Sequence, residues 1–166
     1  MKFDLKQNES KHFFWILLDD KDTTILKGNC FAIRSQSIEE LESFSLQVEH
    51  APVLHDGALI AGNAPNPSSP VSLTFVVKKL DDTWGWDALD STGSVVFNNT
   101  CRYPGRNGFK TLDEACRDAA ARGSSIAFSP IYDGYGVLVN ALHFSRRFAA
   151  SREIKDPHPS ARQYKR

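Results

Sequence analysis

The chain has 166 residues, with 20 Lys and Arg against 20 Asp and Glu, so its formal net charge is zero. This length fits one domain or two very small ones, and a composition with 41% hydrophobic and 11% aromatic residues excludes a mostly disordered or fibrous chain. Neutrality also argues against a globally basic nucleic-acid-binding protein.

The first part of the chain predicts three short strands followed by a helix. Apolar runs and alternation favour strands at Phe3–Leu5, Phe13–Leu18 and Thr24–Leu26. The acidic run at residues 19–22 is typical of a turn between the second and third strands. Ser37 and Glu40 have the spacing of a capping box, in which the hydroxyl and the carboxylate each accept a hydrogen bond from a backbone N–H. We therefore expect a helix to begin at Ser37.

The middle of the chain is predicted to be irregular. His50, His55 and Asp56 are candidate metal ligands, but Pro52 excludes a regular helix across them and the H-E-x-x-H pattern is absent. We expect a loop there, without a metal. Residues 62–70 contain three prolines and no periodicity, which is typical of a linker.

The part after the linker predicts the same order of elements. Strands are expected at residues 72–77, 84–89 and 94–97. Trp84 and Trp86 lie on one face of the second of these strands because side chains alternate. Thr111 and Glu114 form a second capping box, and the helix that follows is expected to end at Gly123.

The end of the chain has no counterpart in the first half. Residues 131–136 are rich in turn-forming residues. A helix is expected over Val137–Ala150, and a strand over Val137–Phe144 is the alternative. Residues 156–160 predict an extended or mobile tail.

The chain resembles itself when shifted by 71 residues. Identical residues at matched positions are Trp15 and Trp86, Leu18 and Leu89, Asp19 and Asp90, and Cys30 and Cys101. We therefore predict an α+β fold of two tandem β-β-β-α repeats that form a pseudo-symmetric domain, with an extra C-terminal helix and tail. The expected boundaries are 1–61 for the first repeat, 62–70 for the linker, 71–128 for the second repeat and 129–166 for the helical extension with its basic tail.

A pattern of strand, turn and helix residues is shared by the two copies. The second copy carries it on Trp86, Leu89, Gly93, Val95, Thr100 and Tyr103. The first copy keeps Trp15 and Leu18, has Asp22 in place of the glycine, and lacks the tyrosine. This pattern resembles the units of the YegP-like family of small duplicated bacterial proteins. The resemblance implies paired β-β-β-α units, and because the biochemical role of the family is not established, it carries over no functional residues.

Aromatic side chains on a strand face are candidate base-stacking residues. Trp84 and Trp86 have this arrangement, as do Phe13 and Trp15 in the first copy. The alternative is that these rings form the core beneath the helices. The acidic pairs at residues 19–20 and 81–82 fall at strand ends, so turns are favoured over general acid–base catalysis there.

The cysteine count argues against disulfides and zinc. Cys30, Cys101 and Cys116 are an odd number and form no C-x-x-C motif. We expect all three to be reduced, buried thiols.

Basic residues gather at the C-terminus. Residues 146–166 hold seven basic residues against two acidic ones, a net charge of +5, which leaves −5 for residues 1–145. The candidate binding residues of this C-terminal arm are Arg146, Arg147, Arg152, Lys155, Arg162, Lys165 and Arg166. Such an asymmetry suggests an arm for nucleic acid or for an acidic protein surface, and a solvated charged tail with no partner is the competing interpretation.

These features favour a non-enzymatic binding or interaction module that associates with a protein partner or with itself. Nucleic-acid binding through the C-terminal arm and an aromatic sheet face is the alternative. A thiol or hydrolytic enzyme would need a Cys or His beside an acid in a pocket, and no catalytic, metal or cofactor motif is present, so no cofactor is expected. No apolar run approaches the roughly 20 residues of a membrane span and the first residues lack a signal-peptide pattern, so we expect a cytoplasmic protein with no membrane partner.

Overall fold

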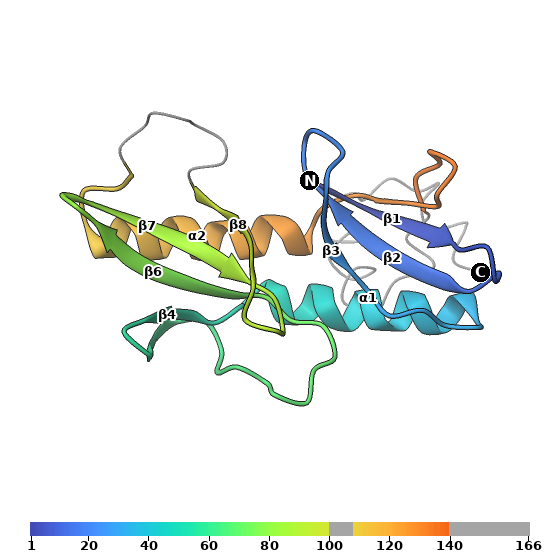
Figure 1. Ribbon diagram of the computed structural model, residues 1–166, viewed down its shortest axis with the longest axis horizontal. Coiled ribbons are helices and arrows are strands. Elements are labelled where there is room, and N and C mark those ends of the chain that lie inside the picture. Colours follow the sequence, from blue (N-terminus) through green and yellow to red (C-terminus); the bar gives the residue numbers. More distant parts are fainter. Residues whose placement is uncertain (100–107, 140–166) are drawn as a thin grey trace, which may run out of the picture.

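The computed structural model describes residues 1–99 and 108–139 (Figure 1). Within these ranges the chain is an α+β structure of two sheets and two helices. Sheet A has the strand order β3-β2-β1-β9, and sheet B has the order β5-β4-β6-β7-β8. The elements in chain order are β1 (Lys2–Gln7), β2 (Phe13–Leu18), β3 (Thr24–Lys27), α1 (Arg34–Val48), β4 (Val53–His55), β5 (Ala58–Ala61), β6 (Thr74–Leu80), β7 (Thr83–Leu89), β8 (Val95–Asn98), α2 (Leu112–Ala127) and β9 (Ile131–Tyr132).

The six strands predicted in the two halves are present, with ends that differ by up to three residues. Each half begins with an antiparallel meander, β1-β2-β3 in sheet A and β6-β7-β8 in sheet B. The side chains alternate as expected, since Trp15 and Trp86 both face inward and are almost fully buried. Periodicity therefore identified the meanders correctly.

A hairpin formed by β4 and β5 was not predicted. Asp56 and Gly57 have positive φ angles of 48° and 78° and form the two-residue turn between the strands. β4 pairs in parallel with β6, and this pairing places the hairpin at the edge of sheet B. The predicted loop is thus wrong from Val53 onward. The linker prediction agrees with the structure to the extent that residues 62–70 contain no helix or strand.

Helix α1 begins at Arg34, three residues before the predicted start. Its N-cap is Ile33, whose side chain makes no capping hydrogen bond, and Ser37 is buried inside the helix. The carboxylate of Glu40 accepts hydrogen bonds from Trp15 Nε1 at 3.0 Å and from the backbone N–H of Asn29 at 2.8 Å. The capping box predicted at Ser37 is wrong because Glu40 instead holds the helix against β2 and the chain after β3.

Helix α2 begins as predicted and ends later. Thr111 is the N-cap, and its hydroxyl accepts from the backbone N–H of Glu114 at 3.1 Å. The Glu114 carboxylate accepts from the N–H of Lys110, one residue before the position a capping box would use. The helix continues through Gly123 to Ala127, so the predicted end at Gly123 is wrong.

Gly123 is buried where α2 crosses α1. A Cβ atom added to Gly123 would lie 2.6 Å from the carbonyl oxygen of Val48 and 3.3 Å from the ring of Phe75. The glycine therefore serves close helix packing rather than helix termination.

The two halves share one hydrophobic core and exchange strands. α1 covers the inner face of sheet A and α2 that of sheet B, and the helices contact each other in the middle, where β3 and β8 also meet (Figure 1). β4, which follows α1, pairs with β6 of sheet B, whereas β9, which follows α2, pairs with β1 of sheet A. Each helix is thus followed by a strand that completes the other half's sheet.

The segment after β9 turns back on itself. Val139 donates its N–H to Ile131 O at 2.8 Å, and Asp133 donates to Val137 O at 3.0 Å. The helix predicted from Val137 is therefore wrong over residues 137–139, where Leu138 instead forms a single antiparallel bridge with Tyr132. The remainder of that prediction and the tail lie outside the described residues. In the part of the chain that is described, no helix is long and apolar enough to cross a membrane.

Candidate interaction surface

Trp86 belongs to the core. It is 1% exposed, and its ring packs edge to face on Phe75 and Phe97 with centroid distances of 5.1 and 5.7 Å. Its indole N–H donates to Asp118 on α2 at 2.8 Å. The ring of Trp86 therefore lies between sheet B and α2 and offers no surface on which a base or a partner could stack.

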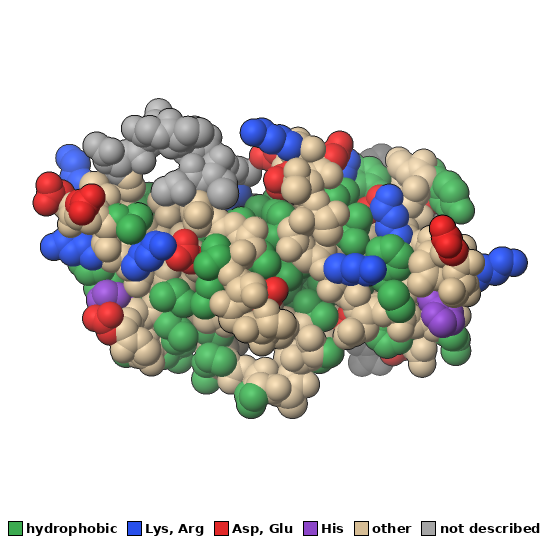
Figure 2. All heavy atoms as spheres, in the orientation of Figure 1, with side chains coloured by type: hydrophobic (Ala, Val, Ile, Leu, Met, Phe, Trp, Pro, Cys, Tyr) green, Lys and Arg blue, Asp and Glu red, His purple; other side chains and the backbone are tan. Residues whose placement is uncertain are grey.

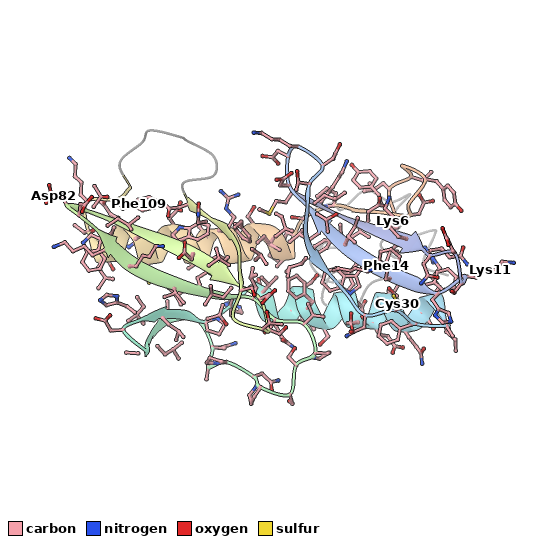
Figure 3. All side chains as sticks on the ribbon, viewed as in Figure 1. Lys6, Lys11, Phe14, Cys30, Asp82 and Phe109 are labelled. Carbon is pink, nitrogen blue, oxygen red and sulfur yellow. The ribbon has the colours of Figure 1, made fainter. Side chains whose placement is uncertain are left out.

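Trp84 lies at the end of sheet B marked by Asp82 and Phe109 (Figure 3). It exchanges two backbone hydrogen bonds of 2.7 Å with Phe109. Its half-buried ring packs on His55 with a centroid distance of 5.2 Å, and Lys79 Nζ lies 5.8 Å from its centre. Of the two tryptophans predicted to bind, this one retains an accessible edge.

The histidines do not converge on a metal site. His55 Nδ1 lies 3.0 Å from Val77 O, and its Nε2 lies 3.3 Å from Asp56. His50 lies beside Glu49, at 3.7 Å. Among residues 1–99 and 108–139, no group of three His, Cys, Asp or Glu side chains is arranged to hold a metal ion.

The acidic pairs lie in turns, as predicted. Asp19 accepts from the backbone N–H groups of Lys21 and Thr23, both at 2.9 Å. Asp81, with φ of 53°, lies in the two-residue turn between β6 and β7. Asp90 forms a similar turn, and a hydrogen bond from the Thr92 hydroxyl holds the pKa of its carboxyl below the usual range. These carboxylates shape the backbone.

The cysteines differ in environment. Cys30 is exposed, which contradicts the predicted burial, because it lies in the irregular chain between β3 and α1. Cys116 is half-buried on α2, and burial raises the pKa of its thiol. Cys101 lies outside the described residues. The raised pKa keeps Cys116 in the thiol form, which is a poor nucleophile.

The chain after β5 lines an open pocket of about 550 Å³ beside the start of β6 and the end of β7. Its apolar walls come from α1, the linker and the start of β6, and include Phe44, Val48, Pro65, Pro67 and Leu73. Ser69 donates to Gln47 Oε1 at 2.7 Å and so holds the linker against α1. Its described lining includes no Lys or Arg.

The outer edge of sheet B is an open, apolar strand. β5 is the last strand in the sheet order, and Ala58, Leu59 and Ile60 are exposed, with Leu59 at 45%. His55 and Ala58 flank the two-residue turn and face each other across the hairpin. In a hairpin with such a turn, the N–H and C=O groups of this flanking pair bond to each other. By alternation, the N–H and C=O of Leu59 point away from β4.

An apolar row leads from this edge across the outer face of sheet B. Leu59 lies opposite Leu54 on β4, and Leu54 lies opposite Val76 on β6. Figure 2 shows hydrophobic side chains gathered over this part of the sheet. Together, the free edge of β5 and the row Leu59-Leu54-Val76 form what we call the β5 surface. The Asp-Gly turn between apolar residues is a strong hairpin signal that could have revealed it from the sequence.

Sheet A has an aromatic side chain on its outer face. Phe14 faces away from the core because its neighbour Trp15 faces inward. Lys6 is its cross-strand partner on β1, and Lys27 Nζ lies 4.4 Å from the centre of its ring (Figure 3). The seven basic residues predicted to form the C-terminal arm, from Arg146 to Arg166, lie outside the described residues.

The fold and these surfaces define an α+β protein of two sheets with an open apolar strand edge. No protein-family model matches the chain, and no curated protein matches it. Among solved structures, the chain is similar to the solution NMR structure of yegP from E. coli, a protein of unknown function. The sequence identity is 12%, the similarity covers 80% of this chain and 90% of that chain, and the TM-score is 0.31. YegP is also the family that the repeat pattern resembles.

Proposed function

We propose that the protein is a non-enzymatic interaction module that binds a protein strand at the β5 surface, with the basic C-terminal arm as a second contact. The observation that carries this proposal is the exposed, apolar edge of β5. An edge strand presents backbone N–H and C=O groups that pair with an added strand, and adjacent side chains add apolar burial and specificity.

β5 is short, with four residues, but its sequence, Ala-Leu-Ile-Ala, carries neither the charge nor the proline that often protects an edge strand. The other described edges are less open: β3 and β8 lie against each other, and β9 is followed by residues 137–139, which pair back on it. These differences favour β5 as the site of association.

The proposal is tested by photo-crosslinking in the source cell. A photoreactive amino acid at Leu59 is expected to give a protein adduct at least several-fold more abundant than the same amino acid at Val95, an exposed residue of β8. Val95 is the matched control because it also lies on an edge strand of sheet B and is 54% exposed. Equal yields at the two positions, or no adduct at Leu59, would overturn the proposal.

We also propose that the chain arose by duplication of a β-β-β-α unit, with copies at 1–61 and 71–128. Several paired features support this. The strand registers show the same irregularity at Leu17 and at Ala88, and the carbonyls of Pro52 and Pro130 accept from Phe75 and Phe3, respectively. The buried tryptophans each donate to an acidic side chain on the helix of the same half, Trp15 to Glu40 and Trp86 to Asp118.

Nucleic-acid binding is the second candidate function. The outer face of sheet A supports it because Phe14 is flanked by Lys6 and Lys27, an arrangement that suits stacking of a base between cationic side chains. The C-terminal arm would add contacts to phosphates. Under this proposal, single-stranded nucleic acid contacts the Phe14 end of this face, because Ile16 and Leu18 farther along β2 are buried.

Fluorescence anisotropy with a labelled single-stranded oligonucleotide at low salt tests this second function. Binding that weakens steeply with salt is expected, and Phe14→Ala should reduce affinity by about tenfold, since one stacked base contributes roughly 1–3 kcal/mol. Tyr135→Ala is the control, because this exposed aromatic residue lies on the loop after β9. No complex at low salt, or equal losses in the two variants, would contradict nucleic-acid binding through this face.

A further inference from the structure

We infer that the strand received at the β5 surface is β5 of a second copy of this chain. The two strands pair antiparallel about a twofold axis perpendicular to the sheets and join the two copies of sheet B into one continuous sheet. This inference rests on the proposed function and names the partner.

The backbone of β5 suits this symmetric pairing. A twofold axis of this kind places a residue opposite its own copy, as in other isologous interfaces. With the axis at Leu59, the two Leu59 residues exchange both hydrogen bonds, since the N–H and C=O of Leu59 point away from β4. Ala58 and Ile60 then lie on either side of the axis, and their small or apolar side chains leave no charge opposed to its own copy.

The apolar row of the β5 surface is also self-complementary. Leu59 lies on the same face as Leu54 and Val76. Pairing at Leu59 therefore makes one uninterrupted row of six apolar side chains, three from each copy, across the joined sheet. Cross-strand contact between the two Leu59 side chains removes apolar area that is 45% exposed in the single chain.

Polar groups at the two ends of β5 favour the same arrangement, because an imidazole N–H can donate a hydrogen bond to a carboxylate. Asp56, at the hairpin tip, has a side chain that is 90% exposed. At the other end, the chain packs on His50, whose carbonyl accepts from Asn63 at 2.9 Å and whose side chain is 63% exposed. Antiparallel pairing places Asp56 of one copy opposite the C-terminal end of β5 in the other copy, where His50 lies. The twofold axis makes this pair of Asp56 and His50 occur twice. Glu49 is also at that end, but its side chain is only 16% exposed, so the imidazole is the group that faces outward.

Sedimentation velocity on the full chain, under reducing conditions because Cys30 is exposed, tests the inference. The wild-type protein is expected to show a dimer that increases with concentration. Leu59→Lys should weaken the dimer at least about tenfold, because two like charges then face each other at the axis, and Val95→Lys should leave it unchanged. Leu59→Pro, which removes the outward N–H without removing a hydrogen bond to β4, is expected to weaken it as well.

A charge exchange gives a second readout. Asp56→Lys alone should weaken the dimer, and combining it with His50→Glu should restore it, which loss of folding in either variant would not produce. A monomer at all concentrations, or a dimer that Val95→Lys weakens and Leu59→Lys does not, would overturn the inference. If crosslinks from Leu59 capture another protein while the pure chain stays monomeric, the second copy is the wrong partner and the interaction function stands. If no crosslink forms, both fail.

Discussion

Replacing Trp86 with alanine is expected to lower the free energy of unfolding by about 3–5 kcal/mol, the usual range for removing a buried tryptophan. The ring fills the space between Phe75, Phe97 and α2, and its loss also leaves the Asp118 carboxylate without its indole donor. Since the total stability of a domain is about 5–15 kcal/mol, the variant should be only marginally folded. Urea denaturation followed by circular dichroism measures the difference.

Two further variants separate the contributions of ring volume and hydrogen bonding. Trp84→Ala is the matched control, because Trp84 lies on the same strand face but is only half-buried, and it should lose clearly less stability than Trp86→Ala. Trp86→Phe keeps an aromatic ring without the donor and should fall between the wild type and the alanine variant. Equal losses for Trp84→Ala and Trp86→Ala would contradict the packing described for sheet B.

Gly123→Val is expected to destabilise the protein by at least about 2–3 kcal/mol, although valine has the better helix propensity. The new Cβ would meet the carbonyl oxygen of Val48, which is backbone and cannot rotate away, and the ring of Phe75. α2 would have to move away from α1, and apolar contacts on both sheets would be lost. Thermal unfolding should show a midpoint lower by roughly 5–10 °C.

Ser125→Val is the control for this second substitution. Ser125 is exposed on the same helix, so the same side chain added there meets no neighbouring helix. Its midpoint should stay within about 2 °C of the wild type. If Gly123→Val were equally harmless, the close crossing of α1 and α2 at Gly123 would be refuted.

Alternation and turn chemistry were sufficient to predict the meanders. Strands such as Lys2–Gln7 bury one face, where Phe3 and Leu5 lie, and this burial imposes a period of two on the sequence. Acidic turn residues such as Asp19 fix their own backbone locally, so their role is visible without knowledge of the fold. These features depend on residues that are close in sequence.

The wrong predictions concern residues whose role depends on distant partners. Ser37 and Glu40 have the spacing of a capping box, but Glu40 is bound by Trp15, which is remote in sequence. Gly123 has the sequence context of a helix end, but it accommodates the backbone of α1. The hairpin of β4 and β5 is the exception, because its Asp56-Gly57 turn is a local signal in the sequence. The tertiary contacts of Glu40 and Gly123 leave no local pattern in the sequence.

β4 pairs with the sheet of the second half, and β9 pairs with the sheet of the first half. Sheet A can therefore be completed only after β9 has been synthesised. β1 is synthesised well before its parallel neighbour β9, which lies near residue 131. Domains generally fold as units during synthesis, and here sheet A lacks one edge strand until almost all of the described chain has been made. The N-terminal half is therefore an incomplete unit while it waits on the ribosome, and a fragment ending before Ile131 would keep the side of β1 that faces β9 unpaired.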